Sequence, residues 1–118
     1  MHELPVTQSV LEIALNHAAS ARRITDIYLV VGQLASFVDD SIQFFWDMIS
    51  EDTIAQGAQL HFRREPAVMQ CYDCGHRYYL GGDFSCPNCS SDMVAVESGE
   101  EFYIESIEVE MEEDIYSS

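Results

Sequence analysis

Two cysteine pairs, Cys71-Tyr72-Asp73-Cys74 and Cys86-Pro87-Asn88-Cys89, contain all four cysteines of the chain and have eleven residues between them. Two residues between paired cysteines let the backbone fold back over one ion, so that two hairpin tips offer four sulfurs to a tetrahedral metal. Gly75 supplies the positive-φ position that such a tip usually needs, and Pro87 fixes φ within the second tip. The spacing therefore predicts a closed, structural zinc site. Its ligands are Cys71, Cys74, Cys86 and Cys89.

Two other interpretations of the four cysteines are open. Two disulfides would need an oxidising compartment, but Met1 to Leu15 shows neither the basic start nor the small-residue cleavage site of a signal peptide. No apolar run approaches the roughly 20 residues of a membrane span, so we expect a cytosolic chain with reduced thiols. Iron is the second alternative, because Cys-x-x-Cys-Gly facing Cys-Pro-x-Cys is also typical of rubredoxin-like proteins and tetrahedral sulfur suits both metals.

The composition limits both the architecture and the class of partner. A chain of 118 residues can form one compact domain plus a small lobe, and a lobe of about thirty residues needs a metal to stabilise it. The chain has 21 acidic residues against five basic ones, which gives a formal net charge of -16. Because nucleic-acid binding needs a basic surface, we expect no nucleic-acid partner. The charge suits metal cations and basic or polar protein partners.

Hydrophobic periodicity predicts two helices and three strands outside the cysteine region. The first helix starts at Leu4 or Pro5 and runs to Ala21, and the second opens at Asp40 and ends near Thr53. The strands are expected at Thr25–Val31, Ala58–Glu65 and Phe102–Val109.

Several local features add detail to this pattern. Gly32 breaks the first strand, as a bulge or a turn. The apolar face of the last strand slips by one residue, and a bulge near Glu105-Ser106 would restore it. The aromatic run Phe44-Phe45-Trp46 is expected in the core because its spacing is helical. Short strands are expected within the cysteine region at Tyr78–Leu80 and Asp92–Glu97.

The order of these elements predicts an α+β fold with an insertion. Two helices pack on a three-stranded antiparallel sheet, and a zinc-ribbon-like lobe interrupts the chain before the third strand. We expect a discontinuous domain at 1–66 plus 100–118 and a zinc-binding lobe at 67–99.

The first three residues, Met1-His2-Glu3, offer a second kind of metal chemistry. Initiator methionine is normally trimmed only before a small residue, so His2 should leave Met1 in place with a free amino group. That amine, the backbone nitrogen of His2 and its imidazole can close two adjacent chelate rings on one ion. Such nitrogen ligands favour the square-planar or tetragonal geometry of Ni²⁺ or Cu²⁺, and the Glu3 carboxylate can complete the shell.

The other histidines are weaker candidates for this site. We expect His17 to face solvent on the first helix and His61 to be exposed on a strand. His76 is expected to be a surface residue as well, but it lies two residues after Cys74 and could exchange with a cysteine at the zinc.

These motifs, in this order, resemble the HypA/HybF family of hydrogenase maturation nickel metallochaperones, and the resemblance covers essentially the whole length. It rests first on Met1-His2-Glu3, on the two cysteine pairs and on a closing strand with Ile107-Glu108-Val109. It also includes Val31-Gly32-Gln33-Leu34 and the strand opening Ala58-x-Leu60. Each motif alone is common, whereas the ordered combination is specific.

The resemblance implies a cytosolic, non-enzymatic protein that binds Ni²⁺ through Met1, His2 and Glu3 and holds a structural zinc on its cysteines. In that family nickel passes, with the help of a partner GTPase, to the large subunit of NiFe hydrogenase. Some members also serve urease, which would add a urease accessory protein as a partner. The sequence does not distinguish a monomer from a homodimer.

Some members of the family change the zinc ligands with nickel or pH, using histidines that flank the cysteine pairs. His76 matches one such position. Ser90 follows Cys89 where a second histidine would be needed, and this departure argues against a full exchange of ligands in this chain.

Two other classes of function are the alternatives. A rubredoxin-like electron carrier would bind iron and give Met1 no role. A zinc-ribbon adaptor would bind protein only, and replacement of His2 would leave its partner function unchanged. An enzyme is not expected, because the four cysteines are already used by the metal and no catalytic constellation stands beside them.

Overall fold

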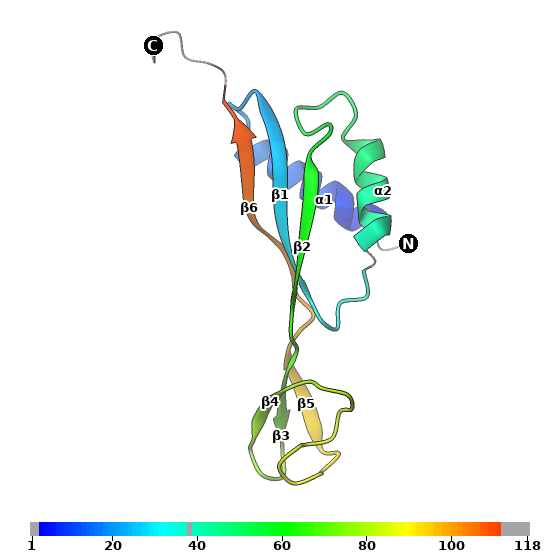
Figure 1. Cartoon of the computed structure of the whole chain (residues 1–118), viewed down its shortest axis with the longest axis vertical. Coiled ribbons are helices and arrows are strands. Elements are labelled where there is room, and N and C mark those ends of the chain that lie inside the picture. Colours follow the sequence, from blue (N-terminus) through cyan, green and yellow to red (C-terminus); the bar gives the residue numbers. More distant parts are fainter. Residues whose placement is uncertain (1–2, 38, 112–118) are drawn as a thin grey trace. The chain divides into compact units, whose positions relative to one another are not determined.

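The computed structural model describes residues 3–37 and 39–111 of the chain (Figure 1). Among these residues, no helix has both the length and the apolar character needed to cross a membrane. In the described part of the chain, two helices and six strands follow one another. In chain order they are α1 (Glu3–His17), β1 (Arg23–Gly32), α2 (Asp39–Ile49), β2 (Gln59–Glu65), β3 (Val68–Cys71), β4 (Arg77–Tyr79), β5 (Val94–Ser98) and β6 (Phe102–Glu110).

The chain divides into two compact units. The first consists of Met1–Leu29, Ser36–Phe62 and Tyr103–Ser118, and the second of Val30–Ala35 and Arg63–Phe102. One three-stranded sheet has the order β2-β1-β6, and a second one has the order β4-β3-β5. The expected α+β class is thus confirmed, with two helices and a separate cysteine-bearing sheet. The domain boundaries at 1–66 plus 100–118 and at 67–99 remain a prediction.

The core of the first unit lies between the two helices and the sheet. Ile24, Ile27 and Leu29 of β1 are fully buried, and α2 contributes Ile42 and Trp46. The packing of Trp46 confirms that part of the aromatic run belongs to the core. The same expectation is wrong for Phe44, which lies on the solvent face of α2 and is 64% exposed.

Strand β6 runs antiparallel to β1. The amide of Arg22 donates a hydrogen bond to the carbonyl of Glu110 at 2.9 Å, and the amide of Gly32 donates to that of Glu101 at 2.7 Å. Residues late in one strand therefore face residues early in the other, as the expected antiparallel sheet requires.

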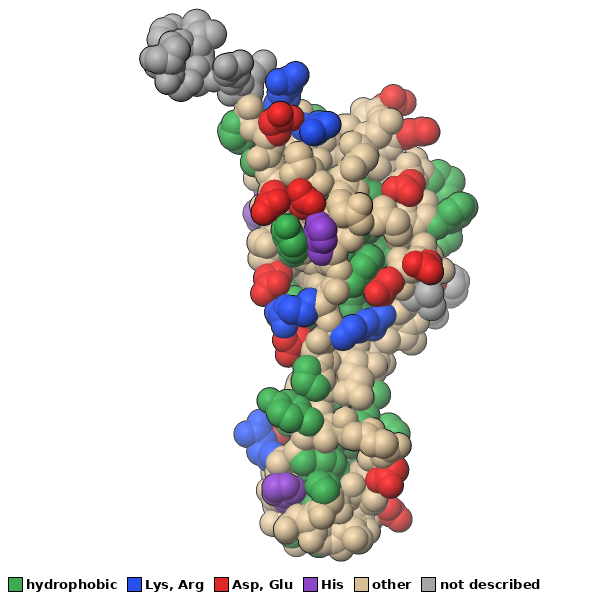
Figure 2. Space-filling view, in the orientation of Figure 1, with side chains coloured by type: hydrophobic (Ala, Val, Ile, Leu, Met, Phe, Trp, Pro, Cys, Tyr) green, Lys and Arg blue, Asp and Glu red, His purple; other side chains and the backbone are tan. Residues whose placement is uncertain are grey.

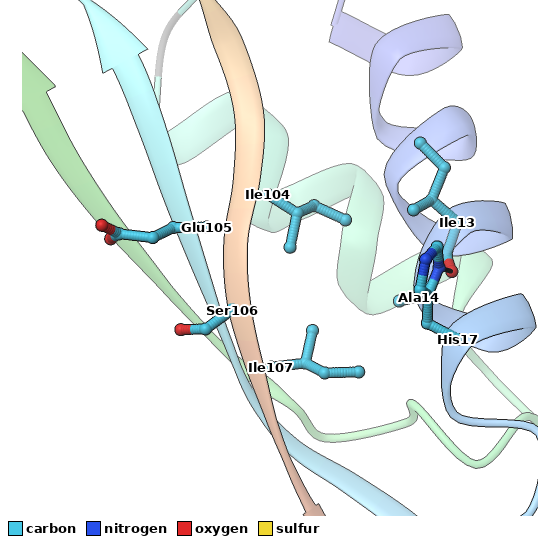
Figure 3. A pocket seen from close by; sticks show the side chains of 7 residues that line it. All are labelled: Ile13, Ala14, His17, Ile104, Glu105, Ser106 and Ile107. Atoms are coloured by element: carbon cyan, nitrogen blue, oxygen red, sulfur yellow. Dashed lines mark hydrogen bonds between the residues drawn. The ribbon is translucent and has the colours of Figure 1, made fainter.

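Strand β2 runs parallel to β1, and here the expected antiparallel pairing is wrong. The amide of Ile24 donates to the carbonyl of Ile54, and the amide of Gln33 donates to that of Glu65, each at 2.8 Å. The arrowheads of β1 and β2 point the same way in Figure 3, opposite to that of β6. The physical reason is the helix between them, because α2 returns the chain to the starting edge before β2 begins.

The second helix ends earlier than its sequence pattern suggests. α2 stops at Ile49, where we expected it to continue to about Thr53. Asp52 adopts a φ of 66°, which no α-helix accommodates, and the Thr53 hydroxyl donates to the Ser50 carbonyl at 2.7 Å. A polar turn therefore replaces the last helical turn. The first helix is also shorter, ending at His17 where Ala21 was expected.

The apolar face of β6 is restored by an extra residue, as predicted. Figure 3 shows Ile104 and Ile107 pointing toward α1, while Glu105 and Ser106 both point away from it. Two adjacent residues on one face break the strand's two-residue alternation, which is the effect of a bulge. The bulge keeps both isoleucines on the helix side of the sheet.

Gly32 ends β1 because two backbones meet there. A Cβ atom on Gly32 would lie 2.1 Å from the carbonyl oxygen of Gly99. Gly99 is itself held against Ala67, with a φ of 134° and room for no side chain. The strand ends at Gly32 as expected, but the need for glycine comes from this close approach.

Replacement of Gly32 tests this contact. We expect Gly32→Ala to lower the free energy of unfolding by about 3 kcal/mol, since the added methyl meets backbone that cannot yield. Gly81→Ala is the matched control, because nothing lies within 4 Å of a Cβ at that position. Denaturant unfolding measured for both variants would contradict the packing argument if the two losses were equal.

Candidate metal centre

The cysteines lie on a small sheet in the second unit. Its central strand β3 ends at Cys71 and pairs antiparallel with β4, where Val68 faces Tyr79, and with β5, where Cys71 faces Val94. The sequence pattern predicts strands close to β4 and β5 but does not predict β3. β3 is only four residues long, which is too short to show a two-residue period of its own.

The two Cys-x-x-Cys tips repeat one backbone hydrogen-bond pattern. In the first tip the amide of Gly75 donates to the carbonyl of Cys71 at 3.0 Å, and the amide of Cys71 donates to that of His76 at 2.9 Å. In the second tip the amide of Ser90 donates to the carbonyl of Cys86 at 2.7 Å, and the amide of Cys86 donates to that of Ser91 at 2.9 Å. The two tips therefore have the same backbone conformation. The equal spacing of the two cysteine pairs in the sequence corresponds to this shared hydrogen-bond pattern.

Both tips need a residue in the left-handed region of φ. Gly75 has a φ of 77°, as predicted, and costs nothing there. Ser90 occupies the equivalent position with a φ of 65°, which is uncommon for a residue with a side chain. The second tip therefore accepts backbone strain that glycine avoids in the first.

The four sulfurs converge on one point. Every Sγ lies within 4.8 Å of the others. The Cys71 and Cys89 sulfurs are 3.6 Å apart and those of Cys74 and Cys86 are 3.7 Å apart. A zinc ion bonded to four sulfurs at about 2.3 Å would place them about 3.8 Å apart, so the observed separations fit a tetrahedral ion. All four cysteines are free, and these distances are far longer than a disulfide bond of about 2 Å.

The sulfurs differ in burial and in hydrogen bonding. Cys71 and Cys86, the first member of each pair, are buried, while Cys74 and Cys89 are exposed. The side-chain amide of Asn88 donates to the Cys74 sulfur at 3.4 Å, and the Asn88 backbone amide donates to the Cys86 sulfur, also at 3.4 Å. The sequence pattern alone does not predict this role of Asn88, although its place inside the second tip was the available signal.

The thiols cannot all lose their protons easily without a cation. The hydrogen bond from Asn88, helped by the His76 amide, lowers the pKa of Cys74 to about 6. The Ser91 amide lowers the pKa of Cys89, but the contact with Cys71, burial and the other thiols outweigh it and raise that pKa to about 12. Binding of a divalent metal must therefore displace protons, and acid should favour metal release.

The histidines lie in three different environments. His17 is exposed as expected, and its Nδ1 lies 3.0 Å from the carbonyl oxygen of Ile13. His61 was expected to be exposed, and this is wrong. Its ring is half-buried, with Nε2 2.8 Å from Asp26 and its plane stacked on Tyr28 at 4.5 Å. That contact lowers the pKa of Asp26, because His61 hydrogen bonds to its carboxylate.

His76 lies beside the cysteine cluster without joining it. Its ring stacks on Tyr78 with the centroids 6.0 Å apart. Within residues 3–37 and 39–111, only the four cysteines form a group of three or more side chains that could hold one metal ion. Exchange of His76 for a cysteine therefore stays a prediction.

Of the predicted nickel ligands, only Glu3 belongs to the part of the chain that the structure describes. Met1 and His2 fall outside the described residues, and Glu3 is the first residue of the helix. The hydroxyl of Thr7, which is fully buried, donates to the Glu3 carbonyl. The first helical turn after the Met1-His2-Glu3 motif is therefore fixed to the core.

Comparison with known proteins gives the family. Residues 1–109 match the family described as "Hydrogenase/urease nickel incorporation, metallochaperone, hypA". The chain belongs to the HypA family. The expected resemblance is thereby confirmed, and the class of function is that of a nickel metallochaperone for hydrogenase maturation, which is not an enzyme family.

Individual relatives match along nearly the whole chain. Hydrogenase maturation factor HypA from Dehalococcoides mccartyi is 44% identical over 115 residues, covering 95% of this chain and 97% of the relative. Hydrogenase maturation factor HybF from Salmonella typhimurium is 35% identical over 113 residues, covering 93% of this chain and 100% of the relative.

Two solved structures share the fold. The solution structure of the Ni metallochaperone HypA from Helicobacter pylori has a TM-score of 0.66 at 21% identity, covering 93% of this chain and 98% of that one. Another solution structure, of a HypA protein, has a TM-score of 0.71 at 23% identity, covering 95% and 98%.

The positive φ of the first tip can be tested by one substitution. We expect Gly75→Ala to destabilise the zinc-loaded second unit by about 1 to 2 kcal/mol, the cost of left-handed backbone for a residue with a Cβ. Gly82→Ala is the control, since both sites offer open space but only Gly75 has a positive φ. Thermal unfolding followed by circular dichroism should separate the two variants, and equal midpoints would contradict the assignment.

The dependence of the second unit on its metal is tested by Cys74→Ala. Loss of one of four thiolate ligands should remove the metal and unfold the small sheet, because a unit of this size lacks the core to fold alone. Elemental analysis would report the metal and circular dichroism the loss of strand signal. An unchanged spectrum after this substitution would mean that the cysteines are not a structural cage.

Proposed function

We propose that this chain binds Ni(II) at its N-terminus through Met1, His2 and Glu3 and delivers it for hydrogenase maturation. The observation that carries the proposal is the family match, which begins at residue 1 and so includes this motif. The ligand set also suits the ion. An amine, a deprotonated backbone nitrogen and an imidazole favour the tetragonal geometry of Ni(II), and a carboxylate can add to the shell.

A terminal nitrogen site suits a carrier because it can release its cargo. Its ligands come from consecutive residues at one end of the chain, so an incoming partner can remove them one at a time. The site should also empty as the pH falls. The α-amine titrates near ~7.7 to 8 and imidazole near ~6.5, so protons compete for both nitrogens well before carboxylates are affected.

The four-cysteine cage has the opposite property. Two of its sulfurs are buried and each tip is closed by its own hydrogen bonds, so a bound ion would leave slowly. We assign it a structural Zn(II), held by Cys71, Cys74, Cys86 and Cys89. Iron fits the same tetrahedral sulfur geometry, and the nickel-handling family favours zinc over an electron carrier.

The remaining parts of the proposal concern partners and compartment. We infer that a nickel-handling GTPase assists the transfer and that the recipient is the large subunit of NiFe hydrogenase. The family description names urease as well, so a urease accessory protein is a further candidate. We place the protein in the cytosol, where free thiols such as these four are maintained.

Substitution of His2 tests the nickel site. His2→Ala should remove the imidazole ligand and with it one of the two chelate rings. We expect Ni(II) affinity, measured by isothermal calorimetry, to fall at least about a hundredfold. Zinc should remain at one ion per chain by elemental analysis, because the cysteines are untouched. His17→Ala is the matched control, an exposed histidine of α1 outside the motif, and it should bind nickel like the unmodified chain.

The same measurements separate the alternatives. Untagged protein should contain zinc and should show no visible absorption from iron-thiolate bonds. A rubredoxin-like carrier would contain iron and show that absorption. Acetylation of the Met1 amine should reproduce the His2→Ala result. Full nickel affinity in either form would refute the terminal site, and a zinc-ribbon adaptor would then be the better description.

A further inference from the structure

A groove lies between α1 and β6 in the first unit (Figure 3). Its helix side is formed by Ile13, Ala14 and His17, and its strand side by residues 104–107. Ile104 and Ile107 point across the groove toward the helix. Ile13 is 46% exposed, which is high for an isoleucine that faces another element of its own unit. The groove is therefore an apolar surface that the described residues leave partly open.

The strand side of the groove is a sheet edge. Among the described residues β6 pairs with β1 alone and ends the sheet. The carbonyl of Glu110 accepts a hydrogen bond from the Arg22 amide, and that of Glu108 accepts one from the Thr25 hydroxyl. Glu108 and Glu110 therefore direct their backbone groups toward β1. Because backbone direction alternates along a strand, Ile107 and Val109 direct their N–H and C=O groups to the open edge. An added strand would find hydrogen-bond partners there.

The size and lining of the groove favour a side chain over a cofactor. Its cavity volume is about 270 Å³. Small-molecule sites usually span about 300 to 1,000 Å³ and carry several convergent polar groups. Here the lining is apolar apart from His17 and the outward-facing pair Glu105 and Ser106. The cavity suits one or two apolar side chains of an extended peptide.

Charge selects the kind of strand that can bind. β6 carries three exposed glutamates, Glu105, Glu108 and Glu110, and acidic side chains gather over this strand in Figure 2. Arg23 pairs with Glu110 at 3.3 Å, and the chain as a whole is strongly acidic. Pairing with a second copy would place like charges opposite one another, and the chain's net charge of -16 opposes it further. A basic strand has the complementary charge.

We propose that the groove between α1 and β6 binds an extended segment of a partner protein. The segment adds as a strand beside β6, inserts an apolar side chain between Ile13 and Ile107, and presents lysine or arginine to the glutamates. Backbone bonding supplies the affinity and the cavity the specificity, as in other complexes that extend a sheet edge. The bulge contributes by aiming both Ile104 and Ile107 into the groove.

This docking surface is independent of the proposed nickel site. Ile13 follows Glu3, the one described residue of the nickel motif, by ten residues, which is about 15 Å along a helix. A peptide in the groove would leave the N-terminal ligands free to hold an ion. Failure of nickel binding would therefore leave this proposal standing, and the reverse also holds.

The test uses the full-length, zinc-loaded chain and a synthetic peptide, acetyl-Lys-Val-Lys-Ile-Lys-Val-Lys-amide. In an amide NMR titration we expect shifts confined to β6 and the second half of α1. The amides of Ile107 and Val109 should gain protection from hydrogen exchange. A peptide with glutamate in place of lysine should not bind, because it lacks the positive charge. A peptide N-methylated at alternate residues should not bind either, because it lacks the backbone hydrogen-bond donors.

Substitutions locate the contact. Ile13→Gln should weaken the peptide's Kd about tenfold by removing the apolar wall of the cavity. Met48→Gln is the control, a 52% exposed apolar residue on α2 outside the groove, and should leave the Kd unchanged. Because Ile13 is half exposed, its replacement should preserve the native amide spectrum.

Three results would overturn the proposal. They are the absence of any shift, shifts spread over acidic surfaces away from β6, and equal binding of the N-methylated peptide. The second would show attraction by net charge alone, and the third would show that no strand is added.

Discussion

Four sulfur atoms that lie within 4.8 Å of one another cannot all carry negative charge unless a cation lies among them, and the second unit is built on this constraint. Its central strand has four residues, and each of its two tips is closed by the same pair of backbone hydrogen bonds. Hydrogen bonds from Asn88 and His76 lower the pKa of Cys74, whereas contact with Cys71 and burial raise the pKa of Cys89 against the Ser91 amide, so the thiols do not lose their protons together. A metal removes this constraint and so supplies stability that a core of this size cannot.

The proposed nickel site obeys a different rule. A structural ion needs ligands fixed by several elements, and the cysteines come from two tips that share one hydrogen-bond pattern. A cargo ion needs ligands that can be withdrawn, and Met1, His2 and Glu3 are consecutive. The first turn of α1, which begins at Glu3, is anchored by the buried Thr7. The two tasks thus use different chemistry in different parts of one chain.

Among the described residues, the first unit also leaves the β6 edge of its sheet unpaired. Edge strands risk unwanted pairing, and proteins limit that risk with charge and with bulges. β6 has both, in its three glutamates and in the pair Glu105-Ser106. The same two features that oppose self-pairing select a basic partner strand and turn the isoleucines toward α1. One strand can therefore resist aggregation and still recognise a protein segment.

The sequence by itself determined the features that depend on local chemistry. The spacing of the cysteines predicted both tips, Gly75 predicted the positive φ, and the slipped pattern of β6 predicted its bulge. The ordered combination of Met1-His2-Glu3 with the two cysteine pairs and the closing strand identified the family, because motifs of consecutive residues need no tertiary structure to be recognised.

Only the tertiary structure decided the contacts between distant residues. It made β2 parallel to β1, paired His61 with Asp26, and pressed Gly32 against Gly99. It also opened the groove between α1 and β6. Periodicity reports which face of an element is buried but not which partner covers it, because the partner is chosen by packing across the whole chain.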